Sequence, residues 1–301
     1  MAPRNPPQSI VADKPTPTPF DWSGRSGEIW RDNQARLDRM LAPCGTAAIT
    51  AAAPAAGERV LDIGCGSGAS SLELARHVGP SGRVLGLDIS EPLLSRARER
   101  VREHVSSDVP ITFQLGDASR DPLPEGSFDL LFSRFGVMFF TDPIAAFSHM
   151  RHALTPDGRL AFVCWRAFDE NDWVRLLMTA VADILPPLPM PPPETPGPFS
   201  FGDPDRVRRM LSDAGFRDVR LEAFDCPLVY GEASTREEAI EAALELSLQV
   251  GPLSRALAEH PPELRERAAS AVRHALGQRA ADHVVAMNGA CWIVTARNHA
   301  A

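Results

Sequence analysis

The stretch that most constrains the fold is a short apolar segment that turns through three glycines, Arg59-Val60-Leu61-Asp62-Ile63-Gly64-Cys65-Gly66-Ser67-Gly68. Its pattern predicts a buried strand, a tight turn, and a helix that starts near Ala69. Glycines at 64, 66 and 68 leave room for a ligand against the backbone, because a Cβ there would block close approach. The start of the following helix offers free N–H groups to an electron-rich ligand.

Asp62 narrows the kind of ligand that this turn would bind. A glycine-rich turn alone is shared by dinucleotide-binding enzymes, and Gly64-x-Gly66-x-x-Ala69 fits their fingerprint loosely. A dinucleotide would place its pyrophosphate at the turn, where a carboxylate repels it. Asp62 therefore favours a ligand that carries an ammonium or a sulfonium. An NAD-dependent oxidoreductase is the alternative.

Three further motifs follow in order along the chain: Leu85-Gly86-Leu87-Asp88-Ile89-Ser90, Leu115-Gly116-Asp117-Ala118, and Phe128-Asp129-Leu130-Leu131-Phe132-Ser133-Arg134-Phe135. Together with the glycine-rich turn they resemble the four motifs of class I S-adenosylmethionine-dependent methyltransferases, over roughly residues 55–165. The resemblance implies S-adenosylmethionine as cofactor and S-adenosylhomocysteine as product. It also implies direct in-line methyl transfer, in which proximity and orientation supply most of the catalysis.

The predicted fold is an α/β, Rossmann-like, mostly parallel sheet with helices on both faces and a helical cap. Strands expected at 59–63, 83–87, 111–115, 128–133 and 159–165 alternate with helices, which implies parallel crossover units. Later strands are expected at 218–230 and 290–296. The family resemblance implies seven strands in the order 3-2-1-4-5-7-6, with the last one antiparallel.

We expect six segments. They are a flexible proline-rich arm at 1–20, a cofactor-binding core with its N-terminal helix at 21–170, a lid helix and proline-rich segment at 171–202, the end of the core at 203–230, a helical cap at 231–286, and the final strand at 287–301. Within these, the pattern predicts a helix over 27–42 that Pro43 ends. Ser234 and Glu237 are expected to form the capping box that opens the cap.

The resemblance also implies roles for individual residues. Asp88 would bind the ribose hydroxyls and Asp117 the adenine amino group, and Asp117 has the alternative role of capping a turn. The expected cofactor-binding set is Asp62, Gly64, Cys65, Gly66, Gly68, Asp88, Ile89, Asp117, Ala118, Ser133, Trp30 and Gln34. Trp30 would close over the cofactor or anchor the arm, and Gln34 would reach the methionyl carboxylate.

The run after the fourth strand is expected to line the substrate pocket, with Arg134, Phe135, Met138 and Trp165. Arg134 would either bind an acidic group of a substrate or pair with a carboxylate of the cap. Arg134 and His149 are the candidates for a catalytic role, and a solvated helix face is the alternative place for His149. Nucleic-acid amino methyltransferases carry an acid or amide followed by Pro-Pro-aromatic here, so Ser-Arg-Phe-Gly argues against that class.

Charge and composition exclude several other functions. A net charge of −8 argues against a surface that binds nucleic acid. The sequence contains no run of 18 apolar residues, so we expect no membrane-spanning helix. Five cysteines lack a metal-like spacing, so we expect no metal. The chain resembles the type 11 bacterial methyltransferases of quinone precursors and natural products. We expect a cytoplasmic enzyme that methylates a small molecule at O, N or C, with a homodimer as one option for its assembly; a protein or peptide methyltransferase is the alternative.

Overall fold

The computed structural model describes residues 20–104, 110–186, 192 and 194–298 of the 301-residue chain. The predicted arm therefore lies outside the described residues except for Phe20, and so does part of the proline-rich segment. The sheet has the order β3 (Ile111–Leu115), β2 (Arg83–Asp88), β1 (Arg59–Ile63), β4 (Phe128–Arg134), β5 (Leu154–Trp165), β8 (Val284–Arg297) and β6 (Arg217–Glu232). A short β7 (Ala280–Ala281) pairs with β8, which runs antiparallel to its neighbours. The predicted sheet order is confirmed.

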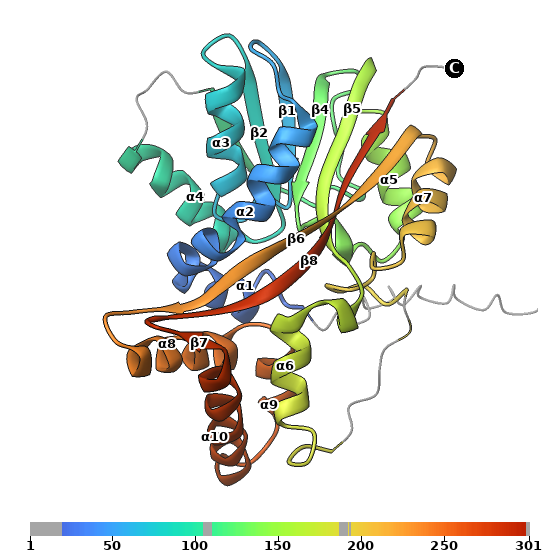
Figure 1. Ribbon diagram of the computed structural model, residues 1–301. Coiled ribbons are helices and arrows are strands. Elements are labelled where there is room, and N and C mark those ends of the chain that lie inside the picture. The colour runs from blue at the N-terminus through green and yellow to red at the C-terminus, as the bar shows by residue number, and fades with distance from the viewer. Residues whose placement is uncertain (1–19, 105–109, 187–191, 193, 299–301) are drawn as a thin grey trace, which may run out of the picture.

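Helices cover both faces of this sheet (Figure 1). On one face, Cys44 of α2 (Gln34–Ala52) contacts Cys291 of β8. On the other, Phe147 of α5 (Pro143–Arg151) stacks on Phe162 of β5. The remaining core helices are α3 (Ala69–Val78), α4 (Glu91–His104) and α7 (Pro204–Asp213). The prediction that helices lie on both faces is thus confirmed.

The N-terminal region differs from the predicted single helix over 27–42. It forms α1 (Arg25–Asp32) and then α2, and Pro43 lies inside α2 instead of ending it. A proline within a helix costs one hydrogen bond and a steric clash, about 3 kcal/mol. Pro43 is exposed, while Leu41 and Cys44 beside it are buried against the sheet. We infer that burial of this helix face offsets the cost of the proline.

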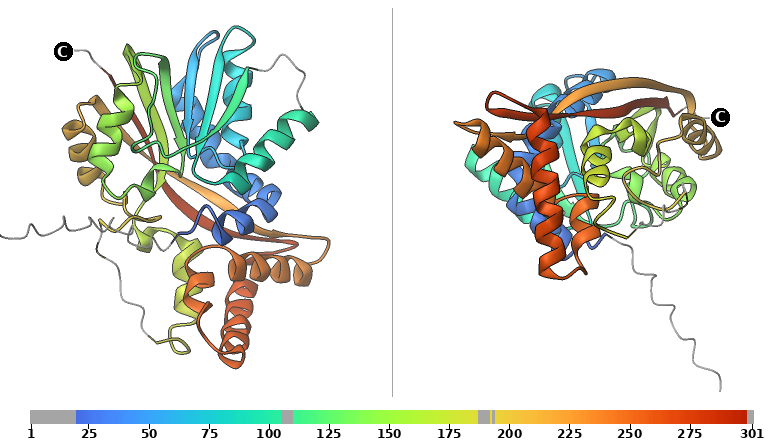
Figure 2. Two further views of the ribbon diagram at one scale, coloured as in Figure 1. Left: turned by 180° about the vertical axis from the view of Figure 1, so that it is seen from behind. Right: turned by 60° about the horizontal axis from the view of Figure 1, so that its bottom comes forward.

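Four helices form a cap beyond the end of the sheet at which β5 ends (Figures 1 and 2). Its members are α6 (Asp172–Ala180), α8 (Arg236–Gln249), α9 (Pro252–Leu257) and α10 (Pro262–Arg279). Strands β6 and β8 are longer than predicted and extend from the core to these helices. Thr235 and Glu238, not Ser234 and Glu237, form the capping box of α8, because the Thr235 hydroxyl accepts the Glu238 N–H and Glu238 binds the Thr235 N–H.

Other element bounds also shift. Strand β5 begins at Leu154, five residues before the predicted start, and α5 ends at Arg151, although its sequence predicts a helix over 143–154. Two short 3-10 helices follow strands of the core: η1 (Val137–Phe139) comes after β4 and η2 (Phe168–Glu170) after β5. None of the helices in the described ranges is long and apolar enough to cross a membrane. The carboxyl ends of β1, β2 and β4 meet at the edge that faces the cap, where ligands bind in open α/β sheets.

Candidate functional site

The glycine-rich turn after β1 packs tightly against the turn after β4. A Cβ on Gly64, whose φ is +62°, would lie 2.8 Å from the Cα of Gly136. A Cβ on Gly68 would lie 3.0 Å from the ring of Phe113. At Gly66, with φ +54°, the nearest such atom is 4.0 Å away. The protein's own packing thus requires glycine at 64 and 68, whereas Gly66 is the position of the three with space beside its backbone.

Asp62 lies directly behind this turn with no exposed surface. Its Oδ2 accepts the hydroxyls of Ser70 at 2.7 Å and Ser71 at 2.6 Å, both from the first turn of α3. Its Oδ1 is buried and has no hydrogen-bond partner among the described residues. Burial raises the pKa of Asp62 to about 6, although the two serine hydroxyls and the guanidinium of Arg134 oppose the shift. An unpartnered carboxylate oxygen at this depth is costly unless a cation or a donor meets it.

Asp88 ends β2 and ties the glycine-rich turn to the start of α4. Its Oδ2 accepts the Gly66 N–H and its Oδ1 accepts the Ser90 N–H, both at 2.8 Å. Burial raises the pKa of Asp88, and these backbone N–H groups oppose the shift. The hydroxyl of Ser23, just before α1, donates to the carbonyl of Ile89 at 3.0 Å. The N-terminal segment therefore lies across the end of β2.

Asp117 caps its own turn. Its Oδ1 accepts the backbone N–H of Ser119 at 2.9 Å and the Ser119 hydroxyl at 2.6 Å, and its Oδ2 lies 3.1 Å from Nε of Arg120. These contacts match the alternative role expected from the sequence, in which Asp117 caps a turn. Ala118 is buried, whereas the Ile89 side chain is 44% exposed. Contacts of Asp117, Ala118 and Ile89 with an adenine ring stay a prediction.

The end of β4 brings a strained residue next to the glycine-rich turn. Ser133 donates to the carbonyl of Ile63 at 2.8 Å and accepts the Gly136 N–H at 3.2 Å. Phe135 has φ +60°, which is a rare conformation for a bulky residue. Its ring stacks on the indole of Trp165, with centroids 4.2 Å apart and planes 18° apart. Such strain persists where the surrounding structure fixes it, often at functional sites.

Two other residues predicted to line the substrate pocket make contacts within the protein. Met138 is 1% exposed, and its carbonyl accepts the Ser200 hydroxyl at 2.7 Å; its contact with a substrate stays a prediction. Arg134 pairs with Asp38 of α2, at 3.2 Å between Nη2 and Oδ1, and not with a carboxylate of the cap. Arg134 and Asp38 are 96 residues apart, and only the packing of α2 on the sheet brings them together.

Gln34 and Trp30 are held by neighbours in the N-terminal region. Gln34 donates to Asp38 Oδ2 at 2.6 Å and accepts from Nε of Arg96 at 3.3 Å. The ring of Trp30 meets that of Trp22 edge-on, with centroids 5.4 Å apart, and Trp22 in turn meets Phe139 of η1 at 5.3 Å. An aromatic cluster therefore joins the segment before α1 to the turn after β4.

The two residues considered for catalysis are separated. His149 lies on α5, and its Nε2 is 2.9 Å from the carbonyl oxygen of Asp121. Arg134 belongs to the opposite face of the sheet, where α2 packs. Both residues are close to the fourth strand in the chain, but they lie on opposite faces of the sheet.

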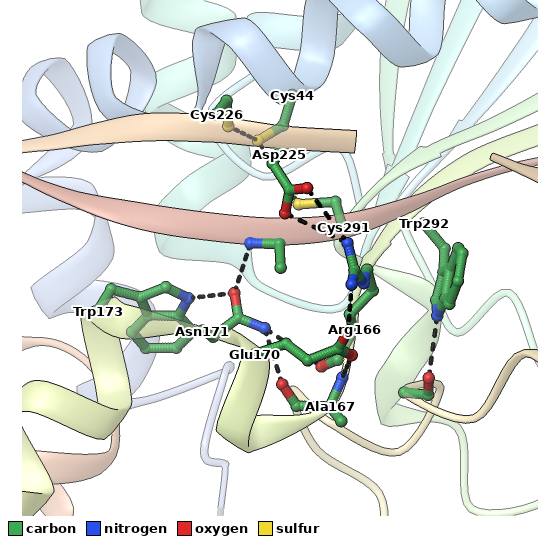
Figure 3. Close-up of polar contacts among 12 residues, drawn as sticks. Cys44, Arg166, Ala167, Glu170, Asn171, Trp173, Asp225, Cys226, Cys291 and Trp292 are labelled. Carbon is green, nitrogen blue, oxygen red and sulfur yellow. Dashed lines mark hydrogen bonds and ion pairs between the residues drawn. The ribbon is translucent and has the colours of Figure 1, made fainter. Parts of the chain in front are cut away.

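Sequence reasoning missed a polar residue that fixes the cap to the core (Figure 3). Asn171 is fully buried, and its Oδ1 accepts the indole N–H of Trp173 at 2.9 Å and the N–H of Ala290 at 2.8 Å. Arg166 pairs with Asp225 of β6 at 3.2 Å in the same region. In the sequence, Asn171 is a single asparagine before a helix. Asparagine is a common N-cap residue, so this position does not indicate its contact with the distant strand β8.

Three of the five cysteines meet in the core, although they are distant in sequence. The sulfur of Cys44 lies 3.1 Å from that of Cys226 and 3.7 Å from that of Cys291, between α2 and the strands β6 and β8 (Figure 3). All three are buried. Within the described ranges, no group of three or more His, Cys, Asp or Glu side chains is arranged to hold a metal ion.

Known proteins resemble this chain in sequence and in fold. Residues 60–158 match the family model described as a methyltransferase domain. The nocamycin O-methyltransferase of Saccharothrix syringae is 32% identical over 175 residues, which are 56% of this chain and 62% of that enzyme. This alignment and those with two other relatives span less than two thirds of the relative's length.

Two solved structures share the fold. The phosphoethanolamine N-methyltransferase 2 of Haemonchus contortus, in complex with phosphomonomethylethanolamine and S-adenosylhomocysteine, is 19% identical with a TM-score of 0.55, and the match covers 90% of this chain and 58% of that one. The [4+2]-cyclase SpnF is 18% identical with a TM-score of 0.56, and the match covers 95% of this chain and 99% of that one. At these identities the likeness concerns the fold alone.

Proposed function

We propose that this chain, whose residues 60–158 match a methyltransferase domain, belongs to the S-adenosylmethionine-dependent methyltransferases of class I and transfers the methyl group of this cofactor to a small organic acceptor. The observation that carries the proposal is the unpartnered Oδ1 of Asp62, buried behind a turn in which Gly66 has open space. This combination suits a ligand with a cationic amino acid end better than one with a pyrophosphate.

The residues present fit S-adenosylmethionine. Asp62 would face its ammonium, directly or through a water molecule, and Gly66 would allow its chain to lie against the backbone. Asp88 would bind the ribose hydroxyls through the acceptor sites that remain on its two oxygens, since each oxygen uses one of them for a backbone N–H. When bound, the cofactor supplies a methyl group on a positively charged sulfur, which is already an electrophile.

The protein's own contribution is position and exclusion of water. The Ser133 hydroxyl locks the turn after β4 to the turn after β1, which fixes the two loops on either side of the expected methyl position. Phe135 and Trp165 form an apolar wall beside them. Such fixed geometry can supply roughly 7–11 kcal/mol of barrier reduction without a charged catalytic group.

Aromatic packing under the cap supports a small-molecule acceptor. Trp173 of α6 contacts Trp165 at 5.1 Å and stacks on Phe199 at 5.7 Å, so apolar rings continue from the end of β5 to the cap. A protein or peptide substrate would need an open groove with polar walls, which this packing does not favour. The nocamycin enzyme is named for O-methylation of a small molecule, and we propose an acceptor of that class. A homodimer and a cytoplasmic location stay predictions.

Isothermal titration tests the cofactor first. We would titrate S-adenosylmethionine, S-adenosylhomocysteine and NADH into the wild type, Asp88→Asn, and the control Asp205→Asn on the exposed surface of α7. We expect the first two ligands to bind to the wild type and the control, and to bind weakly to Asp88→Asn. Binding of NADH alone would favour an oxidoreductase, and binding of no ligand would refute the proposal.

Methyl transfer is tested separately, with radiolabelled cofactor and a panel of phenols, carboxylic acids, amines and quinone precursors. Labelled product from any of these supports the proposal. Since a [4+2]-cyclase has the same fold, tight binding of the cofactor with no transfer across the panel would count against a methyltransferase.

A further inference from the structure

The long strand β6 forms one edge of the sheet. It pairs with β8 on one side, and no strand in the described ranges pairs with its other side (Figure 1). Arg220, Glu222, Ala223 and Asp225 are exposed along this edge. An exposed edge strand offers free backbone groups to a strand of another chain, and native proteins usually guard such an edge or use it. The residues of β6 decide between these two possibilities.

The backbone of Asp225 points toward the open edge. Asp225 lies opposite Ala290 in the antiparallel ladder of β6 and β8. The C=O of Ala290 accepts the Arg166 N–H at 2.9 Å, and its N–H donates to Asn171 at 2.8 Å, so both groups bind residues that follow β5 on the other side of β8. Asp225 and Ala290 therefore exchange no backbone hydrogen bond. In such a pair, the N–H and C=O of each residue point away from the other strand.

Alternate residues of this regular stretch share that orientation, so Leu221 and Ala223 also present an N–H and a C=O to the open edge. Pro227 has the same orientation but carries no N–H, which ends the run of donors on one side. On the other side, the register of the ladder shifts just before Arg220. The part of the edge that suits pairing with another strand is thus the short segment 220–226.

The exposed charges of this segment are complementary to themselves. Cys226 faces α2, because its sulfur lies 3.1 Å from that of Cys44, so Arg220 and Glu222 lie on the same face of the sheet. Neither of these two side chains forms an ion pair with the described residues. In an antiparallel pair of two copies with Leu221 opposite the partner's Leu221, Arg220 lies directly opposite the partner's Glu222. The two-fold symmetry then gives two such ion pairs.

A hollow of about 290 Å³ lies beside Glu222 on this face, between α2 and β6. Besides Glu222, it is lined mainly by small side chains and one ring, those of Ala47, Thr50, Ala51 and Phe224. The apolar stem of an arginine packs well along a surface of this kind while its charged end stays in water. The hollow therefore has room for the stem of the partner's Arg220 where its guanidinium would meet Glu222.

We propose that β6 pairs with β6 of a second copy of this chain, antiparallel and centred on Leu221, so that the two sheets continue as one. Charged residues commonly guard an edge strand against pairing. Here Arg220 and Glu222 instead set the register of the pair. The inference does not depend on the proposed function, because it uses none of the residues at the carboxyl ends of β1, β2 and β4.

Sedimentation equilibrium of the full chain, over a wide range of protein concentrations, measures the association. The edge variants are Glu222→Arg and Arg220→Glu, each of which places like charges opposite each other in the proposed pair. Glu259→Arg, at an exposed position directly after α9, is the control with the same change of charge as Glu222→Arg. Circular dichroism and thermal unfolding establish that each variant is folded.

We expect the wild type and Glu259→Arg to form dimers of equal stability. Each edge variant should weaken the dimer on the order of ten- to hundredfold, since two attractive pairs become repulsive. An equimolar mixture of Glu222→Arg and Arg220→Glu should recover the dimer, because every charge pair across that heterodimer is again of opposite sign.

A wild type that stays monomeric at every concentration would overturn the inference. A wild-type dimer that both edge variants preserve would also overturn it, since the dimer would then use another surface. The mixture gives the third check. If it associates no better than its two components, the pair is not centred on Leu221 and the proposed register is wrong.

Discussion

The ring of Phe135 lies nearly flat on the indole of Trp165, at 4.2 Å between centroids, while the backbone of Phe135 has a positive φ of +60°. The stack and the backbone strain occur in one residue, directly after the strand that ends beside Asp62. A backbone in this region costs of order 1–3 kcal/mol for a residue other than glycine. We infer that the stacking and burial of the Phe135 ring help to offset this cost.

Truncation of Trp165 tests this relation. Trp165→Ala removes the ring that covers Phe135 and also contacts Trp173, and we expect it to lower the free energy of unfolding by about 3–5 kcal/mol. Trp165→Phe keeps a ring in place and should cost less than half as much. Urea denaturation followed by circular dichroism measures both. Equal losses for the two variants would show that the stack is not what stabilises the turn.

The three glycines of the turn should respond differently to alanine. Gly64→Ala puts a Cβ against the backbone of Gly136 at a positive φ, so we expect it to lower the free energy of unfolding by about 2–5 kcal/mol. Gly66→Ala meets open space and should cost only the strain of about 1–2 kcal/mol. It should instead weaken S-adenosylhomocysteine binding. A Gly66→Ala variant that binds the ligand as the wild type does would contradict our account of this position.

The buried carboxyl of Asp62 should make stability depend on pH. Its pKa in the folded protein is about 6, above its ordinary value, because burial disfavours the charged form. A carboxyl with a raised folded pKa stabilises the protein more when it is protonated, so its contribution falls as pH rises. We expect the unfolding free energy of the wild type, minus that of Asp62→Asn, to drop by about 3 kcal/mol in all between about pH 3 and pH 7, most steeply between about pH 4 and 6. A flat difference would show that Asp62 titrates normally.

The same carboxyl should govern how ligand binding depends on pH. If Asp62 meets the ammonium of S-adenosylhomocysteine, binding requires the charged carboxylate. We therefore expect the affinity to rise as pH increases through about 6 and then to level off, and Asp62→Asn to remove this rise. Isothermal titration between pH 5 and 8 measures the effect. A wild type whose affinity does not change over this range would rule out a direct charge contact.

The start of α8 offers a test of a local detail. Thr235 is its N-cap, so Thr235→Ala should lower the free energy of unfolding by about 1 kcal/mol. Ser234→Ala is the matched control one residue away, and we expect it to change stability very little. The reverse order of the two effects would mean that the capping box begins at Ser234, as the sequence suggested.

The sequence predicted those features that depend on residues close together in the chain. The sheet order was implied by the resemblance that the four motifs carry, and the strand that contains Asp62 was predicted from its own apolar residues and the glycines after it. The start of α5 at Pro143 depends on a signal of the same local kind, because the side chain of Asp142 directly before it accepts the Ala145 N–H. Each of these signals spans a few residues, so the sequence contains all of the information.

Contacts between distant segments could not be predicted in this way. The approach of Gly64 to Gly136 and the pairing of Arg134 with Asp38 depend on how loops and helices pack on the finished sheet. Pro43 was expected to end a helix, and it lies inside one because burial of the neighbouring residues outweighs the local preference. Several residues of the candidate site contact segments that are distant in the chain, so their partners could be identified only in the structure.

The length of β6 and β8 has a consequence for motion. The two strands pair without a register shift from Arg220 in the core to Val229 near the cap, so one continuous ladder joins the two regions, although Pro227 within it has no N–H to donate. Closure of one domain on another needs a few hinge residues that are free to change φ and ψ. These paired strands provide no such hinge. We therefore expect core and cap to move as one rigid body, and ligands to enter and leave through local rearrangement of the N-terminal segment around Trp22 and Trp30.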